Sequence, residues 1–236
     1  MNIALILAGG SGQRMGQDVP KQFLCIDNKP VFIYTLENFQ KCDAIDAICV
    51  SCLPGWEATI HAYAGQFNIT KLRTVVSGGE NRFFSILNLL EAIKPFAHES
   101  DIIMTYDAVR PIITDEIILD AIAKTEEIGA AVGVIPCFDS MFSTEEQCSQ
   151  VIGKMQRREL LWRGMGPDTT RFGTALQLFE KYRSTNTKLT LSEMFLDSGL
   201  PVAKSKSSSR CIKLTTLEDV ELFQAMLKYE KYDWLK

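Results

Sequence analysis

The segment Ile3-Ala4-Leu5-Ile6-Leu7-Ala8-Gly9-Gly10-Ser11-Gly12-Gln13-Arg14-Met15-Gly16 decides the class of the fold. A short apolar run that ends in glycine predicts a buried strand that opens into a turn at the carboxyl edge of a sheet, where α/β folds bind ligands. Glycines let backbone N–H groups approach a phosphate closely, and Arg14 and the following Lys21 could neutralise its charge. The segment therefore predicts a phosphate-binding loop. Its candidate backbone contacts are Ala8, Gly9, Gly10 and Gly12.

Two better-known phosphate loops do not match this pattern. The glycines at 10, 12 and 16 are spaced G-x-G-x-x-x-G rather than G-x-G-x-x-G, and no Gly-Lys-Ser/Thr follows as in a P-loop. The second predicted strand ends at Leu53-Pro54, without the acidic residue that NAD-binding domains use there. An ordinary NAD-binding domain is therefore disfavoured. On the glycines alone, a plain glycine-rich turn with surface cations is equally compatible with the sequence.

The composition favours one soluble domain. The length of 236 residues suffices for an α/β domain with a substantial core, and we expect a single domain over residues 1–236. A net charge of −4 and a pI near 5.4 argue against a nucleic-acid binder, which usually presents a basic face. The sequence has no apolar run of ~18 residues and no cleavable N-terminal segment, so we expect no membrane insertion and a cytoplasmic location.

Seven scattered cysteines, an odd number, indicate reduced thiols rather than disulfides. Cys49 and Cys52 form a CxxC, but they lie in a predicted strand, where residues three apart face opposite sides of the sheet. We therefore interpret both as small buried side chains rather than as a redox pair or a zinc site.

Strands and helices alternate through the first 136 residues. Alternation at this spacing implies a mostly parallel sheet with right-handed crossovers and helices on both faces. The fold class is therefore predicted as α/β, with a Rossmann-like three-layer α/β/α arrangement. The predicted strands after the first are 47–53, 72–77, 101–106 and 130–136, and the predicted helices are 31–39, 81–94 and 116–128.

The pattern weakens between Asp139 and Trp162, where a polar stretch precedes one possible short strand at 151–155. Such an excursion predicts a protruding arm around 139–162, either a lid or a segment that a second subunit covers. Beyond it we expect helices at 176–183, 189–198 and 216–228 and an edge strand at 201–205.

The string Asp107-Ala108-Val109-Arg110-Pro111 follows the predicted strand 101–106. A carboxylate at the end of a strand, beside a phosphate site, is well placed to hold Mg²⁺, which takes oxygen ligands and bridges phosphates. The alternatives for Asp107 are a helix cap or a salt bridge to Arg110.

Another motif begins with Gly78-Gly79 and continues to Arg82 and Ser85. Glycines after a strand allow close approach to a base or ribose, and residues three apart at a helix start share one face. By spacing alone, a simple strand-to-helix turn fits equally well.

Five segments, in order, resemble the cytidylyltransferases that act on 2-C-methyl-D-erythritol 4-phosphate and on ribitol 5-phosphate. The similarity runs from about residue 3 to about residue 228 and implies a nucleotidyltransferase that uses CTP with Mg²⁺ or another divalent cation. The segments are Gly9–Lys21 with the following Gln22-Phe23, Ser77–Ser85, Asp107–Pro111, Arg158–Asp168 and Arg210–Asp219.

The resemblance also implies roles for individual residues. It makes Arg14, Lys21 and Lys213 the catalytic cations and Asp107 the metal ligand, while Thr215 or Thr216 caps the last helix. For Lys213 the alternative is a solvated surface lysine. Cytosine recognition falls to Gly78, Gly79, Arg82 and Ser85, and acceptor binding to Arg110, Asp139, Arg158 and Thr190.

The acceptor half departs from the family pattern, whereas the nucleotide half keeps it. Gly166 and Asp168 stand where Thr and Gln are expected, residues 190–194 replace a Thr-Asp segment, and no lysine follows Asp139-Ser140. The missing lysine, Val109 and the Gly55-Trp56-Glu57 turn favour a ribitol-type acceptor.

The resemblance therefore predicts a CTP-dependent transfer of CMP to a polyol phosphate that gives a CDP-polyol and pyrophosphate. Such an enzyme serves isoprenoid biosynthesis or cell-wall and capsule synthesis, and we expect a homodimer. The alternative is a non-catalytic relative that binds CTP or a CDP-polyol and has lost acceptor-site residues.

Overall fold

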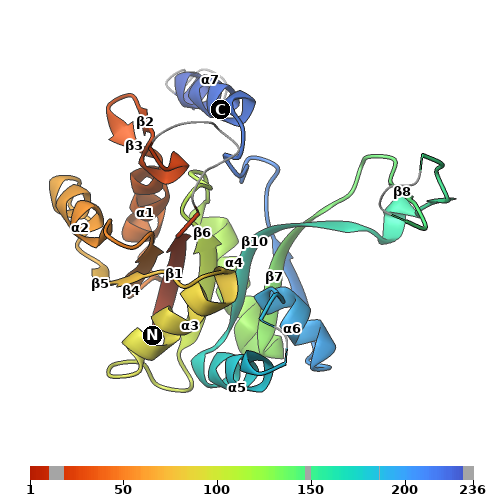
Figure 1. Cartoon of the computed structure of the whole chain (residues 1–236), viewed down its shortest axis with the longest axis horizontal. Helices are drawn as coiled ribbons and strands as arrows, with labels where there is room; N and C mark the ends of the chain where they lie inside the picture. Colours follow the sequence, from red (N-terminus) through yellow and green to blue (C-terminus); the bar gives the residue numbers. More distant parts are fainter. Residues whose placement is uncertain (11–18, 147–149, 186, 231–236) are drawn as a thin grey trace.

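The computed structural model describes residues 1–10, 19–146, 150–185 and 187–230 and places a seven-stranded sheet between two layers of helices (Figure 1). The strand order is β11-β7-β10-β6-β1-β4-β5, and neighbouring strands are parallel except around β10, which is antiparallel to both β6 and β7. The strands are β1 Asn2–Ala8, β4 Ala47–Cys52, β5 Leu72–Ser77, β6 Ile102–Asp107, β7 Ala130–Pro136, β10 Trp162–Arg171 and β11 Ala203–Lys206. The predicted α/β class is confirmed.

Helices cover both faces of the sheet because its strands are apolar on both faces. In β1, Ala4 and Ile6 belong to the core under α1, α2 and α4, whereas Ile3 and Leu5 belong to the core under α3, α5 and α6. The helices are α1 Val31–Lys41, α2 Glu57–Gln66, α3 Arg82–Ile93, α4 Asp115–Ile128, α5 Phe172–Arg183, α6 Leu191–Asp197 and α7 Leu217–Glu230. None of the described helices is long and apolar enough to cross a membrane.

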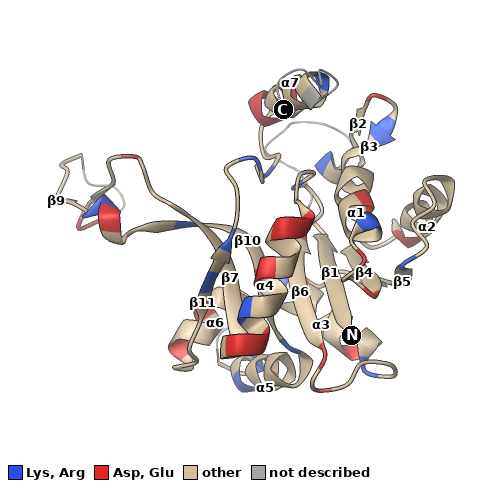
Figure 2. Ribbon diagram, turned by 180° about the vertical axis from the view of Figure 1, so that it is seen from behind, with Lys and Arg blue, Asp and Glu red and all other residues tan. Residues whose placement is uncertain are grey.

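Helix α4 shows how the sequence divides a helix between core and solvent. Ile117, Ile118 and Ala121 are buried against the sheet. Figure 2 shows acidic residues along the outer side of α4. This amphipathic pattern is the signal from which the helix at 116–128 was predicted.

Two predicted strands, 72–77 and 130–136, match β5 and β7 residue for residue. Helix α2 was not predicted, because its pattern is weak: only Ile60 and Ala64 are buried. Helix α5 begins at Phe172 rather than at the predicted residue 176. Cys49 and Cys52 lie in the two opposite cores, as predicted, and the cysteines of the described ranges are free.

The largest difference from the prediction is β10, a ten-residue strand in the middle of the sheet. Its sequence contains two glycines and Pro167, residues that strands disfavour, and it does not alternate. The pairing with β7 shifts register between Gly164 and Asp168, which accommodates the proline. There β7 and β10 approach closely, since a Cβ at Gly133 would lie 2.1 Å from the Gly166 oxygen.

The predicted arm is present and projects from the sheet beyond β7 and β10 (Figures 1 and 2). Beyond the paired root, where Trp162 lies opposite Pro136, it carries a short hairpin of β8 Phe142–Ser143 and β9 Lys154–Met155. The strand predicted at 151–155 is thus only two residues long. Several large apolar side chains of the arm are exposed, among them Phe138 and Leu160, 78% and 66% accessible.

A second small hairpin, β2 Cys25–Ile26 with β3 Lys29–Pro30, follows a 3₁₀ turn at Lys21–Phe23. It packs with the C-terminal helix α7 through Ile26, Val31 and Phe223. This contact brings the segment before α7 to the carboxyl edge of the sheet.

Candidate functional site

A cleft of about 470 Å³ lies at the carboxyl edge of β1 and β6, in the size range of small-molecule sites. Nine of the residues predicted as functional line it: Ala8, Gly9, Gly10, Lys21, Gly79, Arg82, Ser85, Asp107 and Lys213. The remaining lining residues are Leu7, Gln22, Glu80, Asn81, Val109 and Thr215. Arg14 and Gly12, also predicted, lie outside the described residues.

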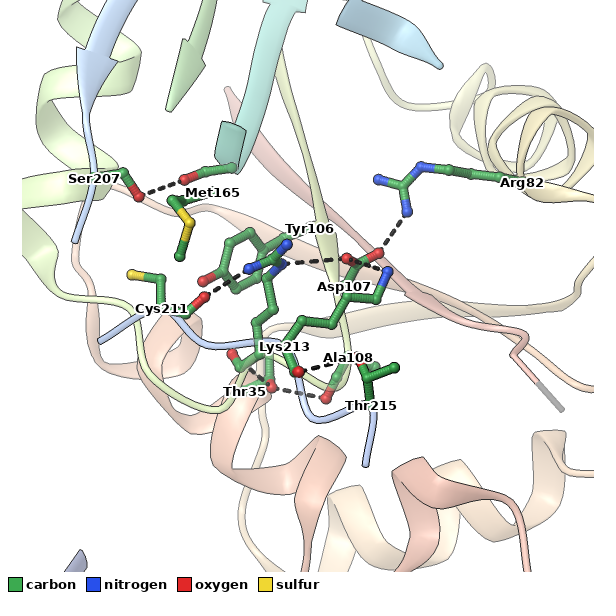
Figure 3. Close-up of polar contacts among 12 residues, drawn as sticks. Thr35, Arg82, Tyr106, Asp107, Ala108, Met165, Ser207, Cys211, Lys213 and Thr215 are labelled. Carbon is green, nitrogen blue, oxygen red and sulfur yellow. Dashed lines mark hydrogen bonds and ion pairs between the residues drawn. The ribbon is translucent and has the colours of Figure 1, made fainter. Parts of the chain in front are cut away.

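Asp107 is the centre of charge in this cleft (Figure 3). One oxygen accepts from Arg82 Nη1 at 2.5 Å, and the other lies 3.0 Å from Lys213 Nζ and 3.3 Å from Arg110 Nε. Its side chain is 12% exposed, whereas Arg82 and Lys213 are 37% and 39% exposed. Three cations from three distant parts of the chain therefore converge on one carboxylate.

This convergence controls the ionisation of Asp107. Burial alone would raise the pKa of the carboxyl, but the charges of Arg82 and Lys213, helped by Arg110, outweigh it and hold the pKa well below its ordinary value. Asp107 is therefore a carboxylate at any physiological pH. The salt bridge to Arg110 that the sequence suggested as an alternative is present.

Arg110 also fixes the C-terminal segment. Its Nη1 donates to the Cys211 carbonyl at 2.6 Å, and the Leu214 N–H donates to the Val109 carbonyl at 2.9 Å. These bonds hold Lys213 beside Asp107. At the start of α7 the Asp219 carboxylate accepts from the N–H groups of Thr215 and Thr216, whereas the hydroxyl of Thr215, one of the two predicted caps, donates to the Lys213 carbonyl.

The Gly78-Gly79 turn is held by Ser85 at the start of α3. The Ser85 hydroxyl accepts from the Gly79 N–H at 3.1 Å and donates to the Asn81 carbonyl at 2.8 Å. A Cβ at Gly79 would lie 2.2 Å from the Phe84 Cβ, so this turn requires glycine. The Gly78 N–H donates to the Cys52 carbonyl at the end of β4. The turn is thereby placed against the opening loop, where Gly9 faces Ser85.

Gln22 is a site residue that the sequence prediction did not single out. Its side chain is 1% exposed, and its amide donates to the Ala8 carbonyl at 2.6 Å. The neighbouring Lys21 passes close to Gly10, where an added Cβ would lie 4.0 Å from Lys21 Cε. In the Pro-Lys-Gln-Phe motif, Gln22 thus fixes the end of β1 by a hydrogen bond, and Lys21 places a cation at the cleft.

A second carboxylate, that of Asp168 on β10, lies near Asp107, which ends β6. Burial is the main cause that raises its pKa to about 6; the charge of Arg82 opposes this shift and that of Asp107 adds to it. The hydroxyl of Ser192 in α6 lies near Asp168 and also lowers its pKa. The sequence showed Asp168 only as a departure from the family pattern, since its position depends on the unpredicted strand β10.

None of the four predicted acceptor residues lines the cleft, and Arg110 reaches it only through its ion pair with Asp107. Thr190 caps α6 in a capping box with Glu193. Asp139 and Arg158 are exposed on the arm, where Arg158 Nη1 donates to the Phe138 carbonyl at 3.4 Å and Nε lies 3.7 Å from Glu159. The structure therefore does not bring Arg158 to the cleft of its own chain.

The residues of the cleft fit a divalent cation that arrives with phosphates better than a cation held by protein alone. Among the described residues there is no group of three or more His, Cys, Asp or Glu that could hold a metal. Mg²⁺ commonly takes one or two carboxylates and completes its shell with phosphate oxygens and water. Asp107 supplies a carboxylate of that kind.

Comparison with known proteins identifies the family. The family model of 2-C-methyl-D-erythritol 4-phosphate cytidylyltransferase matches residues 2–229. A ribitol-5-phosphate cytidylyltransferase from Lacticaseibacillus paracasei is 34% identical over 232 residues, which cover 97% of this chain and 98% of that protein. A 2-C-methyl-D-erythritol 4-phosphate cytidylyltransferase from Clostridium botulinum is 32% identical, with coverage of 96% and 97%.

Solved structures agree on the fold. The crystal structure of 4-diphosphocytidyl-2C-methyl-D-erythritol synthase from Anaerococcus prevotii superposes with a TM-score of 0.81 at 22% identity and covers 96% of this chain and 98% of its own. A Francisella tularensis 2-C-methyl-D-erythritol 4-phosphate cytidylyltransferase superposes with a TM-score of 0.75 at 24% identity, over 94% and 99% of the two chains. The chain belongs to this cytidylyltransferase family of nucleotidyltransferases.

Proposed function

We propose that the protein transfers CMP from CTP to a polyol phosphate, which gives a CDP-polyol and pyrophosphate. The observation that carries this proposal is the convergence of Arg82, Arg110 and Lys213 on Asp107 in a nucleotide-sized cleft at the strand edge. Such a cleft offers positive charge to phosphates and glycine backbone to the rest of the nucleotide.

In the proposed reaction an oxygen of the acceptor phosphate attacks the α-phosphorus of CTP in line. The bond from that phosphorus to the bridging oxygen breaks, and pyrophosphate leaves with the electron pair. The attacking phosphate is already anionic, so no general base is needed, and the protein acts by positioning and by stabilising charge. Lys21 and Lys213, together with Arg14, are the residues proposed for this stabilisation.

A divalent cation bound with the nucleotide would neutralise phosphate charge, and Asp107 is the residue that would hold it. The chain's own contribution follows from the ion pairs. Phosphates that enter the cleft compete with Asp107 for Arg82 and Lys213, since both cations are partly exposed. Their exchange of partners would free the carboxylate oxygens for the metal.

The acceptor is proposed to be a pentitol phosphate such as ribitol 5-phosphate. The ribitol-5-phosphate enzyme of L. paracasei is 34% identical to this chain over nearly its whole length. The absence of a lysine after Asp139-Ser140 and the presence of Val109 point the same way. A product of this kind would serve cell-wall or capsule synthesis rather than isoprenoid synthesis.

We further propose a homodimer in which the arm of one subunit supplies Arg158 to the acceptor phosphate of the other. Arg158 lies on a projecting arm whose apolar side chains are exposed, and its planar guanidinium suits a phosphate. Light scattering coupled to size-exclusion chromatography would then give twice the chain mass. A monomer at working concentration would contradict this part of the proposal.

The reaction is tested by incubating the purified protein with Mg²⁺, one nucleotide and one acceptor and by measuring pyrophosphate. CTP, UTP and ATP are compared with ribitol 5-phosphate and with 2-C-methyl-D-erythritol 4-phosphate. We expect turnover with CTP and ribitol 5-phosphate. Binding of CTP without turnover on any polyol phosphate would instead favour a non-catalytic relative.

A further inference from the structure

Asp168 is a carboxylate with an incomplete set of partners. It is half-buried, and no Lys, Arg or His of the described ranges forms an ion pair with it. The hydroxyl of Ser192 in α6 lies near Asp168, but no side chain of the described ranges donates a hydrogen bond to the Asp168 carboxylate. A carboxylate offers about four acceptor positions, and a partly desolvated one with few donors is costly to keep.

The register of the sheet places this carboxylate next to the cleft. Asp168 lies opposite Thr105 in the antiparallel pair of β10 and β6, and directly opposed residues point to the same face. Asp107 is two residues beyond Thr105 and shares that face. Asp168 is therefore a diagonal neighbour of Asp107, on the side of the sheet covered by α3 and α6.

The groups around Asp168 leave its remaining oxygen positions for a ligand. The Thr190 hydroxyl lies 2.7 Å from Glu193 Oε2 and 3.3 Å from Ser192 Oγ, so it is used within the cap of α6. Arg82 influences Asp168 through its charge but forms its ion pair with Asp107. The surroundings of Asp168 would therefore be completed by a ligand that carries hydrogen-bond donors and no negative charge.

We propose that Asp168 is a specificity-determining residue, which accepts hydrogen bonds from the hydroxyls of the acceptor's neutral carbon chain and excludes acceptors that carry a second anionic group there. The inference rests on the proposed function, because it assigns a place to the polyol part of the proposed acceptor. Hydroxyl groups supply the donors that Asp168 lacks, whereas a second carboxylate or phosphate would place like charge against the Asp168 carboxylate, which has no cation of the described ranges as an ion-pair partner.

The test compares two acceptors with one carbon skeleton, ribitol 5-phosphate and ribonic acid 5-phosphate, whose terminal carbon is a carboxylate. Calorimetric titration into protein saturated with α,β-methylene CTP measures acceptor affinity without turnover. The neutral variants are Asp168→Asn and, in case that protein does not fold, Asp168→Gln. The matched control is Asp197→Asn, since Asp197 is likewise an aspartate without an ion pair to the described residues and accepts from the hydroxyl of Tyr182 at the other end of α6.

We expect the wild type to bind ribitol 5-phosphate at least about tenfold more tightly than ribonic acid 5-phosphate. Asp168→Asn should weaken the binding of ribitol 5-phosphate about 10–100-fold, as for a lost hydrogen bond to a charged group, and should reduce the preference between the two acceptors to about threefold or less. In turnover the change should appear in the acceptor KM rather than in kcat. Asp197→Asn should leave both affinities unchanged.

Unchanged affinities and an unchanged preference in the neutral Asp168 variant would overturn the inference. A wild type that binds ribitol 5-phosphate but releases no pyrophosphate with CTP would remove the proposed function, and the affinity ratios would still decide the role of Asp168. A wild type that binds the CTP analogue but neither acceptor would overturn both.

Discussion

The proposed nucleotide cleft around Asp107 and the proposed acceptor corner, which is Asp168 on β10 with the neighbouring start of α6, differ in how their charges are balanced. In the cleft, the carboxylate of Asp107 is paired with three cations. In the corner, Asp168 forms no ion pair with a cation of the described ranges, and Arg158, the cation proposed for the acceptor, lies on the arm. Among the described residues, the carboxylate of the cleft has cation partners, whereas that of the corner has none. This difference is the reason for proposing that the second substrate binds at the corner.

The strongest test of the cleft is Lys21→Ala. Loss of one donor that stabilises transition-state charge commonly costs about 2.7–4 kcal/mol, so pyrophosphate release should fall about 10²–10³-fold. Steady-state release and the thermal midpoint are measured together, and the midpoint should change little. Lys29→Ala is the control, because Lys29 pairs with Glu37 away from the cleft. Wild-type turnover in Lys21→Ala would refute the assignment of the cleft.

Asp107→Asn tests whether the Asp107 carboxylate offsets the positive charge of the three cations around it. Without that charge Arg82, Arg110 and Lys213 repel one another, and the free energy of unfolding at pH 7 should fall by about 1.5–3 kcal/mol. The pKa of Asp107 is depressed in the folded state, so its contribution is present above the unfolded pKa and is lost as pH falls below about 4.

Urea unfolding of Asp107→Asn and wild type at several pH values measures this difference. Glu37→Gln, which breaks the exposed pair with Lys29, should cost at most about 1 kcal/mol. If Asp107→Asn and wild type were equally stable at pH 7, the three cations would not need the Asp107 carboxylate to offset their mutual repulsion.

Asp168→Asn should have the opposite effect on stability. The pKa of Asp168 is raised by burial to about 6, so the protonated form is favoured in the folded state. The corresponding stabilisation is present below the unfolded pKa near 4 and is lost as pH rises through 6. At pH 8 the variant should therefore be more stable than wild type by about 1–3 kcal/mol, and near pH 4 the two should be equal.

Urea unfolding at pH 4.5 and at pH 8 checks this crossover. A variant that is less stable than wild type at both pH values would contradict this, because it would show that the ionised Asp168 side chain stabilises the fold instead of destabilising it. Greater stability together with a higher acceptor KM is the combination expected of a binding residue.

Arg158→Ala should have the smallest effect on affinity, and it should affect the binding of the acceptor but not that of CTP. We expect acceptor binding about tenfold weaker, which corresponds to ~1.4 kcal/mol, with CTP binding unchanged. Separate calorimetric titrations measure the two affinities, and Arg157→Ala is the neighbouring control. Equal losses for CTP and acceptor would contradict a role confined to the acceptor.

The same two regions differ in how far the sequence predicts them. The apolar runs of β1, β5 and β7 and the Gly78-Gly79 turn after β5 are local signals, so they follow from the sequence. Most of the glycine loop after β1 lies outside the described residues. The cation at Lys213 came from the family resemblance, and the structure places it at Asp107.

The acceptor corner could not be predicted in this way, because it depends on β10. Pro167 and the two glycines of β10 give its sequence no strand pattern, so the strand was not predicted. Its antiparallel register with β6 is what brings Asp168 beside Asp107. Arg82 was predicted to contact the nucleotide, but its ion pair with Asp107 depends on how α3 packs on the sheet. Contacts between distant segments leave no periodic signal in one sequence.

The register of β10 also limits how the length of this chain can vary between relatives. From Asp168 to Thr170 the strand is paired with both β6 and β7, and Arg171 pairs with β6 alone. The strand ends at Arg171, and the N–H of Phe172, the first residue of α5, donates to the Asp101 carbonyl. One residue gained or lost there would turn Asp168 and Thr169 to the opposite faces of the sheet. The arm between residues 137 and 161 is not bound by this register. Insertions and deletions should therefore be found in the arm and be absent from the four residues that lead from Asp168 into α5.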